Sequence, residues 1–162
     1  MRSVRASNQP KRGLSARIVS EARDTTTLIA DLTREMKALA STPIRSVETT
    51  LLIHPHVLGD FLAYNDFLAV ADHRVADLGF EGVLQIASFH PAYRFAESEA
   101  DAVEDYTNRS PHPMLHLLRE DSVSAVANDP DELLEIPRRN VETLRRMGLR
   151  KILEMKAIIE EA

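Results

Sequence analysis

Short apolar runs and amphipathic stretches alternate along the first half of the chain. Residues 15–22 and residues 49–54 each have an apolar centre of strand length, and Pro55 stops the second because proline cannot donate to a ladder. Residues 82–89 (GVLQIASF) have apolar side chains on both faces, as a strand that is covered on both sides requires. The pattern therefore predicts three strands in this part of the chain.

Two amphipathic stretches lie between these strands, and each contains residues suited to a helix end. In the first, Asp24 can cap a helix that Pro43 ends; the second starts at about Asp60 and reaches Gly79, where a helix C-cap favours glycine. Apolar residues recur at helical spacing in the first stretch, namely Leu28, Leu32, Met36 and Leu39. Both stretches are therefore predicted to be helices.

The predicted order strand, helix, strand, helix, strand is typical of parallel strands joined by right-handed helical crossovers. A polar loop follows to about Ser110, and helices are predicted at 111–127 and 134–160, the last with a break near Gly148. We therefore expect an α/β fold: a single domain over 15–162 with a small, mainly parallel βαβαβ sheet, flanking helices and a helical C-terminal part.

Composition excludes several classes of protein. The chain has 162 residues, the length of one domain, and it contains no cysteine. The absence of cysteine rules out a disulfide scaffold, thiolate zinc, iron–sulfur ligation and cysteine catalysis. No apolar run is long enough to cross a bilayer, so no membrane association is expected. No residue pattern identifies a cofactor.

Charge is distributed unevenly along the chain. Residues 1–20 carry five basic side chains and no acid, whereas the rest of the chain holds 15 basic and 25 acidic side chains. An acidic body repels phosphates, so no nucleic-acid partner is expected. Residues 1–14 are rich in Arg and Ser, as a transit peptide is, but lack the apolar core of a secretory signal. We expect a disordered or atypical N-terminal segment there and a cytoplasmic protein.

The second and third predicted strands both end in a His-Pro pair, at His54 and His90. Ligands of open parallel sheets bind beyond the carboxyl ends of the strands, where both histidines would lie if these strands were neighbours. Histidine exchanges protons near neutral pH. His90 is therefore a candidate catalytic residue, with His54 and Gln85 in supporting roles. Each histidine could instead hydrogen-bond only a nearby loop carbonyl.

The polar loop could hold an anion. Ser110 is a natural N-cap with Pro111 at the first helical position, and a helix start favours anions through its unpaired N–H groups. The candidate residues for binding a phosphate or carboxylate are Arg94, Asn108, Arg109, Ser110 and Arg119. The alternative is a plain turn in which the arginines pair with Glu97, Asp101 or Asp105.

Three polar residues of the predicted helix over 111–127 are spaced four apart. His112, His116 and Glu120 would share one helix face. His116 and Glu120 are candidate catalytic residues beside His90. No metal is predicted from this spacing; if one bound, His90, His116 and Glu120 would be its ligands. A solvated polar face, with Glu120 paired to an arginine, explains the same residues.

Four segments carry motifs that are shared with a known family. They are TTLLIHP, GVLQIASFHPAYRF, TNRSPHPMLHLLRE and IPRRNVETLRRMGL, and they resemble a bacterial and plant family, the domain-of-unknown-function family 1415, over most of residues 15–148. The family has no established reaction. The resemblance implies that one set of residues belongs together: His90, Asn108, Arg109, Ser110, His116, Arg119 and Glu120. The chain departs from the family in lacking a Cys-Pro-Phe triplet within residues 1–14 and in having His112 at an aromatic position.

Two functions of different classes fit these residues. The first is an enzyme that acts on a small anionic metabolite by acid–base or hydrolytic chemistry. In it His90 and His116 would exchange protons, Glu120 would orient a histidine or act as base, and arginines would hold the anion. The second is a non-catalytic ligand-binding or protein-interaction module that could form a homo-oligomer through its C-terminal helix. In a third interpretation, the motifs only hold the fold together.

Overall fold

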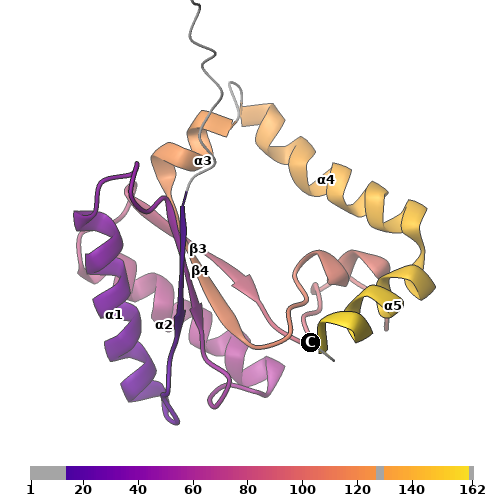
Figure 1. Cartoon of the computed structure of the whole chain (residues 1–162), viewed down its shortest axis with the longest axis horizontal. Helices are drawn as coiled ribbons and strands as arrows, with labels where there is room; N and C mark the ends of the chain where they lie inside the picture. Colours follow the sequence, from indigo (N-terminus) through magenta and orange to yellow (C-terminus); the bar gives the residue numbers. More distant parts are fainter. Residues whose placement is uncertain (1–13, 127–129, 161–162) are drawn as a thin grey trace, which may run out of the picture.

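The computed structural model describes residues 14–126 and 130–160, so the predicted N-terminal segment lies outside the described residues except for Leu14. Four strands form one sheet in the order β1-β2-β4-β3 (Figure 1): β1 (Ser15–Val19), β2 (Thr49–Ile53), β3 (Leu84–Phe89) and β4 (Met114–Arg119). β1 and β2 are parallel, whereas β4 runs antiparallel to both of its neighbours, β2 and β3. The α/β class is confirmed, but the sheet is mixed rather than mainly parallel.

The fourth strand corrects the helix that was predicted over 111–127. This segment forms β4 and the short helix α3 (Glu120–Val126) instead. In β4, the buried Leu115 and Leu117 alternate with half-buried residues, which is the period of a strand. The run MLHLLR is too short for apolar spacing to separate strand from helix. Its conformation follows from its place between β2 and β3, whose backbone N–H and C=O groups it pairs.

Two helices, α1 (Thr25–Ser41) and α2 (Phe61–Asp77), cover one face of the sheet (Figure 1). The Asp24 carboxylate accepts the N–H of Thr27, which confirms Asp24 as the cap of α1. The predicted apolar stripe of α1 is buried against the strands in a core that contains Leu28, Leu32, Met36, Leu39, Leu52, Leu84, Leu115 and Leu117. Helix packing on this face therefore provides most of the core.

The opposite face of the sheet is less covered. Strand pairing places Leu51, His116 and Ala87 in one row across this face, and all three are half-buried. Leu84 is the one buried residue of β3, and the other five are half-buried. The prediction that residues 82–89 form a strand buried on both faces is therefore wrong, although the strand itself is present.

Tyr64 of α2 joins the ends of β3 and β4. Its buried hydroxyl donates a hydrogen bond to the Met114 carbonyl at 2.8 Å and accepts one from the Phe89 N–H at 3.0 Å. Phe89 and Met114 are the last pair of the β3–β4 register. Burial raises the pKa of Tyr64 far above its ordinary value, so the hydroxyl stays protonated and keeps both bonds.

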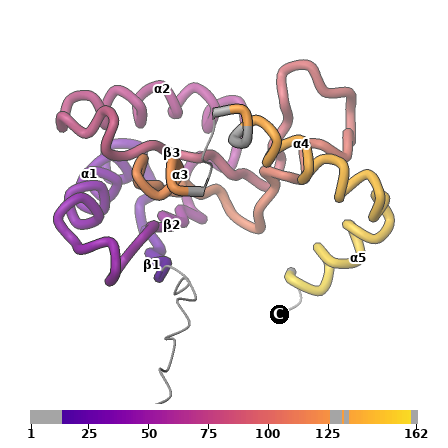
Figure 2. The backbone as a smooth tube through the Cα atoms, turned by 90° about the horizontal axis from the view of Figure 1, so that it is seen from above, coloured from indigo at the N-terminus to yellow at the C-terminus, as the bar shows by residue number. Residues whose placement is uncertain are grey.

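The two C-terminal helices, α4 (Pro130–Met147) and α5 (Leu149–Glu160), lie to one side of the sheet (Figure 1 and Figure 2). Gly148 separates them with a φ of 76°, which glycine adopts without strain, so the predicted break is confirmed. The first of these helices begins at Pro130, four residues before the predicted start. We call the two helices together the C-terminal arm.

The arm is anchored on the loop that follows β3. This loop contains a short 3-10 helix, η1 (Val103–Thr107), against which α4 packs, and Arg145 of α4 forms an ion pair with Glu104 of η1. Among the helices of residues 14–126 and 130–160, none combines the length and the hydrophobicity that a membrane span needs.

We expect Tyr64→Phe to lower the free energy of unfolding by about 1–3 kcal/mol, because the Met114 carbonyl and the Phe89 N–H lose their hydrogen-bond partner. Urea denaturation at neutral pH measures this loss. Tyr93→Phe is the matched control, because the Tyr93 hydroxyl lies 3.5 Å from Ser88 Oγ, too far for a strong bond. Its loss should be below about 0.5 kcal/mol. Equal losses in the two variants would contradict the bridging role of Tyr64.

Candidate functional site

The structure brings His54 and His90 to the same edge of the sheet. Their strands, β2 and β3, are not neighbours, because β4 lies between them. Both strands nevertheless run antiparallel to β4 and so end at one edge. Tyr64 lies between the two histidines, with its ring centroid 5.9 Å from that of His54 and 5.0 Å from that of His90. Both imidazoles are buried, with exposures of 0% and 1%.

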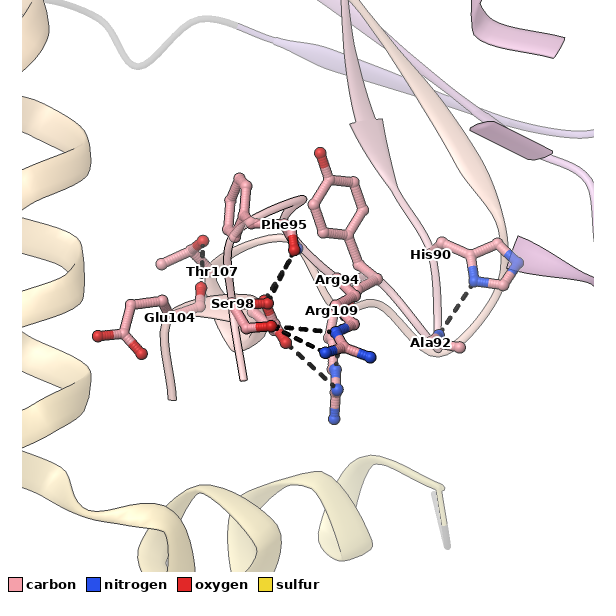
Figure 3. Close-up of polar contacts among 10 residues, drawn as sticks. His90, Ala92, Arg94, Phe95, Ser98, Glu104, Thr107 and Arg109 are labelled. Atoms are coloured by element: carbon pink, nitrogen blue, oxygen red, sulfur yellow. Dashed lines mark hydrogen bonds and ion pairs between the residues drawn. The ribbon is translucent and has the colours of Figure 1, made fainter. Parts of the chain in front are cut away.

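Hydrogen bonds occupy both ring nitrogens of His90. Nδ1 accepts the N–H of Ala92 at 3.0 Å (Figure 3), and Nε2 lies 3.1 Å from the Leu58 carbonyl. A carbonyl only accepts, so Nε2 carries the hydrogen and the ring is neutral. In this arrangement His90 has no nitrogen left to exchange a proton with a ligand.

His54 is held in a similar way on the other side of Tyr64. Its Nδ1 lies 3.0 Å from the Val57 carbonyl and therefore donates to it, while the buried Nε2 has no hydrogen-bond partner within the described residues. The interpretation that each histidine bonds a loop carbonyl is thus confirmed for His54 and His90.

Burial keeps these imidazoles uncharged. Removal from water lowers the pKa of His54 and of His90, and the nearby His90 ring lowers that of His54 further. Carbonyl acceptors on the loop after β2 oppose this effect in both residues, and for His90 so does the negative charge of Asp60. Burial likewise lowers the pKa of His116.

The three candidate catalytic residues do not form one site. His116 lies on the sheet face opposite α1 and α2, where its ring packs 6.2 Å from that of Phe89. Glu120 follows Arg119, which pairs with Leu84, whereas His90 follows the Phe89–Met114 pair at the other end of the ladder. The five residue steps between these pairs span about 17 Å. The structure therefore does not bring His90, His116 and Glu120 into one site, and the helix face predicted to carry His116 and Glu120 is absent because this segment forms β4.

The same geometry removes the alternative metal site. His90, His116 and Glu120 cannot ligate one ion, because ligand atoms must lie about 2 Å from it. Within residues 14–126 and 130–160 no group of three or more His, Asp or Glu side chains is arranged to hold a metal ion.

Arg119, a candidate anion-binding residue, binds backbone carbonyls instead. One terminal nitrogen donates to the carbonyls of Leu39, Thr42 and Val47 at 2.6 to 3.0 Å. These carbonyls lie at and just beyond the end of α1, where helix carbonyls lack internal donors. Arg119 therefore stabilises the C-terminus of α1. Gln85, the other supporting candidate, pairs with Leu118 on the less covered sheet face and is half-buried.

Most polar candidates in the loop after β3 hold the loop itself. Asn108 Nδ2 donates to the Ser88 carbonyl, and Arg94 donates from two nitrogens to the Ser98 carbonyl. Ser110 Oγ donates to the His112 carbonyl at 2.6 Å. The predicted N-cap at Ser110 and the anion site at a helix N-terminus are wrong, because the next element is a strand, β4, that begins at Met114.

Arg109 is held at the centre of this loop. Its Nε donates to the Tyr93 carbonyl at 3.2 Å, its guanidinium carbon lies 4.3 Å from the Tyr106 ring centroid, and Nη2 lies 3.8 Å from Asp105 Oδ2. Asp105 is fully buried, and its other oxygen accepts the Phe95 N–H. The predicted alternative that an arginine pairs with Asp105 is confirmed for Arg109.

A pocket opens where Arg109 meets the C-terminal arm. Its volume is about 180 Å³, and we call it the Arg109 pocket. One wall comes from the loop and the other from the arm; the lining residues are Tyr106, Arg109, Ser110, Pro111, Leu144, Met147, Ile152, Met155, Lys156 and Ile159. Figure 3 shows Arg109 extending from the loop on the side where α5 lies. Two predicted anion-binding residues, Arg109 and Ser110, thus line a real cavity.

A second hollow, of about 740 Å³, follows the loop between Phe95 and Glu104. Four acids line it, namely Glu97, Glu99, Asp101 and Glu104. Their negative charge makes this hollow unsuitable for an anion, whereas the described lining of the Arg109 pocket includes the cations Arg109 and Lys156.

Sequence reasoning found the loop wall of the Arg109 pocket and missed the arm wall. Leu144, Met147, Ile152 and Met155 read as the apolar stripe of an amphipathic helix. Lys156, spaced four residues after Ile152, was the available signal that a cation accompanies this stripe. Nothing local in the sequence indicates that α5 faces residues 106–111.

Comparison with known proteins identifies a family. A family model described as a protein of unknown function (DUF1415) matches residues 6–154. None of the curated proteins and none of the solved structures matches the chain.

We expect the free energy of unfolding to fall as the pH decreases from 7 to 5. Removal from water holds the folded pKa values of His54, His90 and the half-buried His116 below the unfolded value of about 6.5. Stability from the neutral rings is therefore present above pH 6.5 and is lost as the pH falls through the folded pKa values. Each ring contributes a slope of at most about 1.4 kcal/mol per pH unit. Urea denaturation at several pH values measures the profile.

Two variants test which rings cause this slope. His116→Gln should make it shallower, because one of the three rings is gone. His73→Gln, at an exposed position on α2, should leave it unchanged. A wild-type profile that is flat between pH 7 and 5 would contradict the assignment of buried neutral imidazoles.

Proposed function

The chain belongs to the DUF1415 family of proteins of unknown function, and we propose its function from the Arg109 pocket. The protein is a non-catalytic module that binds a small anionic ligand between the loop after β3 and the C-terminal arm. The enzyme hypothesis depended on proton transfer between groups in direct contact. His90, His116 and Glu120 are apart and do not line the pocket, so these residues do not meet that requirement.

The observation that carries this proposal is the placement of Arg109 in a cavity wall. Three contacts fix its guanidinium: the Tyr93 carbonyl, the Tyr106 ring and Asp105. A guanidinium has five N–H groups, and only the Nε–H is used in a hydrogen bond between described residues. A cation that is already oriented loses little conformational entropy when it binds an anion.

A ligand in this pocket would connect two parts of the fold. Tyr106 and Pro111 belong to the loop, while Leu144 and Ile152 belong to α4 and α5. A ligand that contacts both walls stabilises the arm against the loop. Binding therefore raises the stability of the folded protein, which gives a direct assay.

We expect at least one small anion to raise the melting temperature. A panel of phosphate, sulfate, acetate, butyrate, malonate and benzoate is measured by differential scanning fluorimetry. At a ligand concentration of 100 times Kd, the stabilisation is about 2.7 kcal/mol, or about 5–10 °C for a protein of this size. An unchanged melting temperature with every member of the panel would contradict the proposal.

The variant for this assay is Asp105→Asn/Arg109→Gln. Changing both residues avoids leaving the buried Asp105 without its partner. The double variant should lose the anion-dependent shift. Arg17→Gln, which removes an exposed arginine from β1, should keep it. An anion shift of equal size in the double variant would show that the anion binds elsewhere.

We also propose that two copies associate through α5. Met155, Ile158 and Ile159 of α5 are 45%, 68% and 58% exposed and lie within about 100° of one another around the helix, so they form a contiguous apolar surface of the kind that marks an association site. Size-exclusion chromatography with light scattering should give twice the chain mass of 18.2 kDa. Ile158→Glu should give a monomer, while Leu62→Glu, at an exposed position on α2, should not. A monomeric wild-type protein would contradict this association.

A further inference from the structure

The loop after β3 begins with a tight turn that His90 holds in two ways. The His90 carbonyl accepts the N–H of Tyr93 at 3.1 Å, which closes a four-residue β-turn with Pro91 at its second position. Inside this turn, His90 Nδ1 accepts the N–H of Ala92 at 3.0 Å (Figure 3). The conformation of the turn therefore depends on both the backbone and the imidazole of His90.

The same turn places a group that holds Arg109. The Tyr93 carbonyl, at the end of the turn, accepts Arg109 Nε–H at 3.2 Å. The His90 carbonyl also accepts the N–H of Ser110 at 3.4 Å, so the turn and the exit of the loop meet at one residue. Arg109 and Ser110 both line the Arg109 pocket. A change in the turn at His90 therefore reaches the loop wall of the pocket through one hydrogen bond.

The hydrogen bonds of His90 require one particular form of its ring. Nδ1 accepts the Ala92 N–H only while it carries no hydrogen, whereas Nε2 donates to the Leu58 carbonyl in either form. A proton taken up from solvent must therefore go to Nδ1, where it would face the Ala92 N–H. Two donors cannot form one hydrogen bond, so protonation breaks the contact inside the turn and leaves the Leu58 contact in place.

The surroundings of His90 set the pH at which this contact breaks. The titratable groups that the structure places around His90 are His54 after β2, Asp60 before α2, Tyr64 on α2 and Tyr93 in the turn. Burial lowers the pKa of His90, although carbonyls of the loop after β2 and the charge of Asp60 favour the protonated ring. The ring is therefore neutral at pH 7 and takes up its proton below the ordinary value of about 6.5.

From this geometry we infer that His90 is a positioning residue for the Arg109 pocket, and that a proton on its Nδ1 weakens anion binding there. Protonation opens the turn and releases the Tyr93 carbonyl from Arg109 Nε. The other two contacts of the guanidinium, with Tyr106 and Asp105, persist, so Arg109 loses orientation and keeps its place in the wall. The inference rests on the proposed function, because it concerns the regulation of the same pocket.

The test is an NMR titration of the full chain from pH 7.5 to 5.0 without any ligand. The His90 ring, the Ala92 amide and Arg109 Nε–H are each followed through their own signals. The Ala92 and Arg109 signals should shift with the midpoint of the His90 ring, whereas the amides of Leu32 and Met36 in the core of α1 should not.

Three results of this titration would overturn the inference. In the first, the Arg109 signal stays fixed while the His90 ring takes up its proton. In the second, the core signals of α1 shift with the same midpoint, so the change is global rather than confined to the loop. In the third, the His90 ring remains neutral down to pH 5.0, so the pocket has no such control.

His90→Asn and His116→Gln are the matched variants. An asparagine oxygen can accept the Ala92 N–H in place of Nδ1 and does not titrate, so His90→Asn should keep the Arg109 signal fixed over the whole pH range. His116 is half-buried and also has a lowered pKa, but it belongs to β4 and not to the turn, so His116→Gln should keep the wild-type shift. A shift that persists in His90→Asn would overturn the inference. The wild-type titration decides it alone if His90→Asn does not fold.

Sulfate affinity connects the turn to the pocket, because sulfate keeps the same charge from pH 7.5 to 5.0. Its Kd, measured by isothermal titration calorimetry, should rise about tenfold once His90 is protonated, the effect of losing one hydrogen bond to a charged group. His90→Asn should show no such rise. An equal or lower Kd at pH 5.0 in the wild-type protein would overturn the inference and leave the anion site standing. Sulfate that binds at no pH counts against the proposed function instead, since the spectra establish the coupling of His90 to Arg109 without a ligand.

Discussion

An antiparallel strand separates two parallel ones, and the positions of the candidate residues follow from this constraint. Because β4 fills the space between β2 and β3, the chain must return along the sheet after β3 before it can continue. The loop that makes this return starts at His90 and therefore lies at the edge where β2 also ends. Strand alternation then turns His116 away from α1 and α2, and Glu120 leaves the sheet at the opposite edge. The position of β4 in the sheet thus separates His116 and Glu120, which would share one face of a helix.

Many polar side chains at these positions form hydrogen bonds with backbone groups. Buried N–H and C=O groups need partners, and a sheet whose chain reverses by a long loop has many at its edge. Tyr64, His90 and Asn108 supply them at the end of β3, and Arg119 supplies them at the end of α1. Their presence in motifs shared with a family is consistent with the interpretation that such motifs hold the fold together.

Local pattern predicts what is decided locally. The strands at 15–22, 49–54 and 82–89 and the helices beginning at Asp24 and near Asp60 follow from periodicity and capping, which act within a few residues. β4 was not predicted, because its six residues fit the helix period as well as the strand period. Its conformation depends on pairing with β3 and β2, which lie 30 and 65 positions earlier in the sequence. The Arg109 pocket was half predicted for the same reason: its loop residues are adjacent in sequence, while its arm wall depends on tertiary packing.

The three carbonyls held by Arg119 imply an order of assembly during synthesis. Leu39, Thr42 and Val47 leave the ribosome long before residue 119 does. Until then the end of α1 is hydrated and the first crossover frays, and β2 has only β1 beside it. When β4 emerges, it pairs with both β2 and β3, and its last residue, Arg119, binds the carbonyls at the end of α1. The nascent chain would therefore remain loosely organised through its first two helices and become cooperative only in its last third.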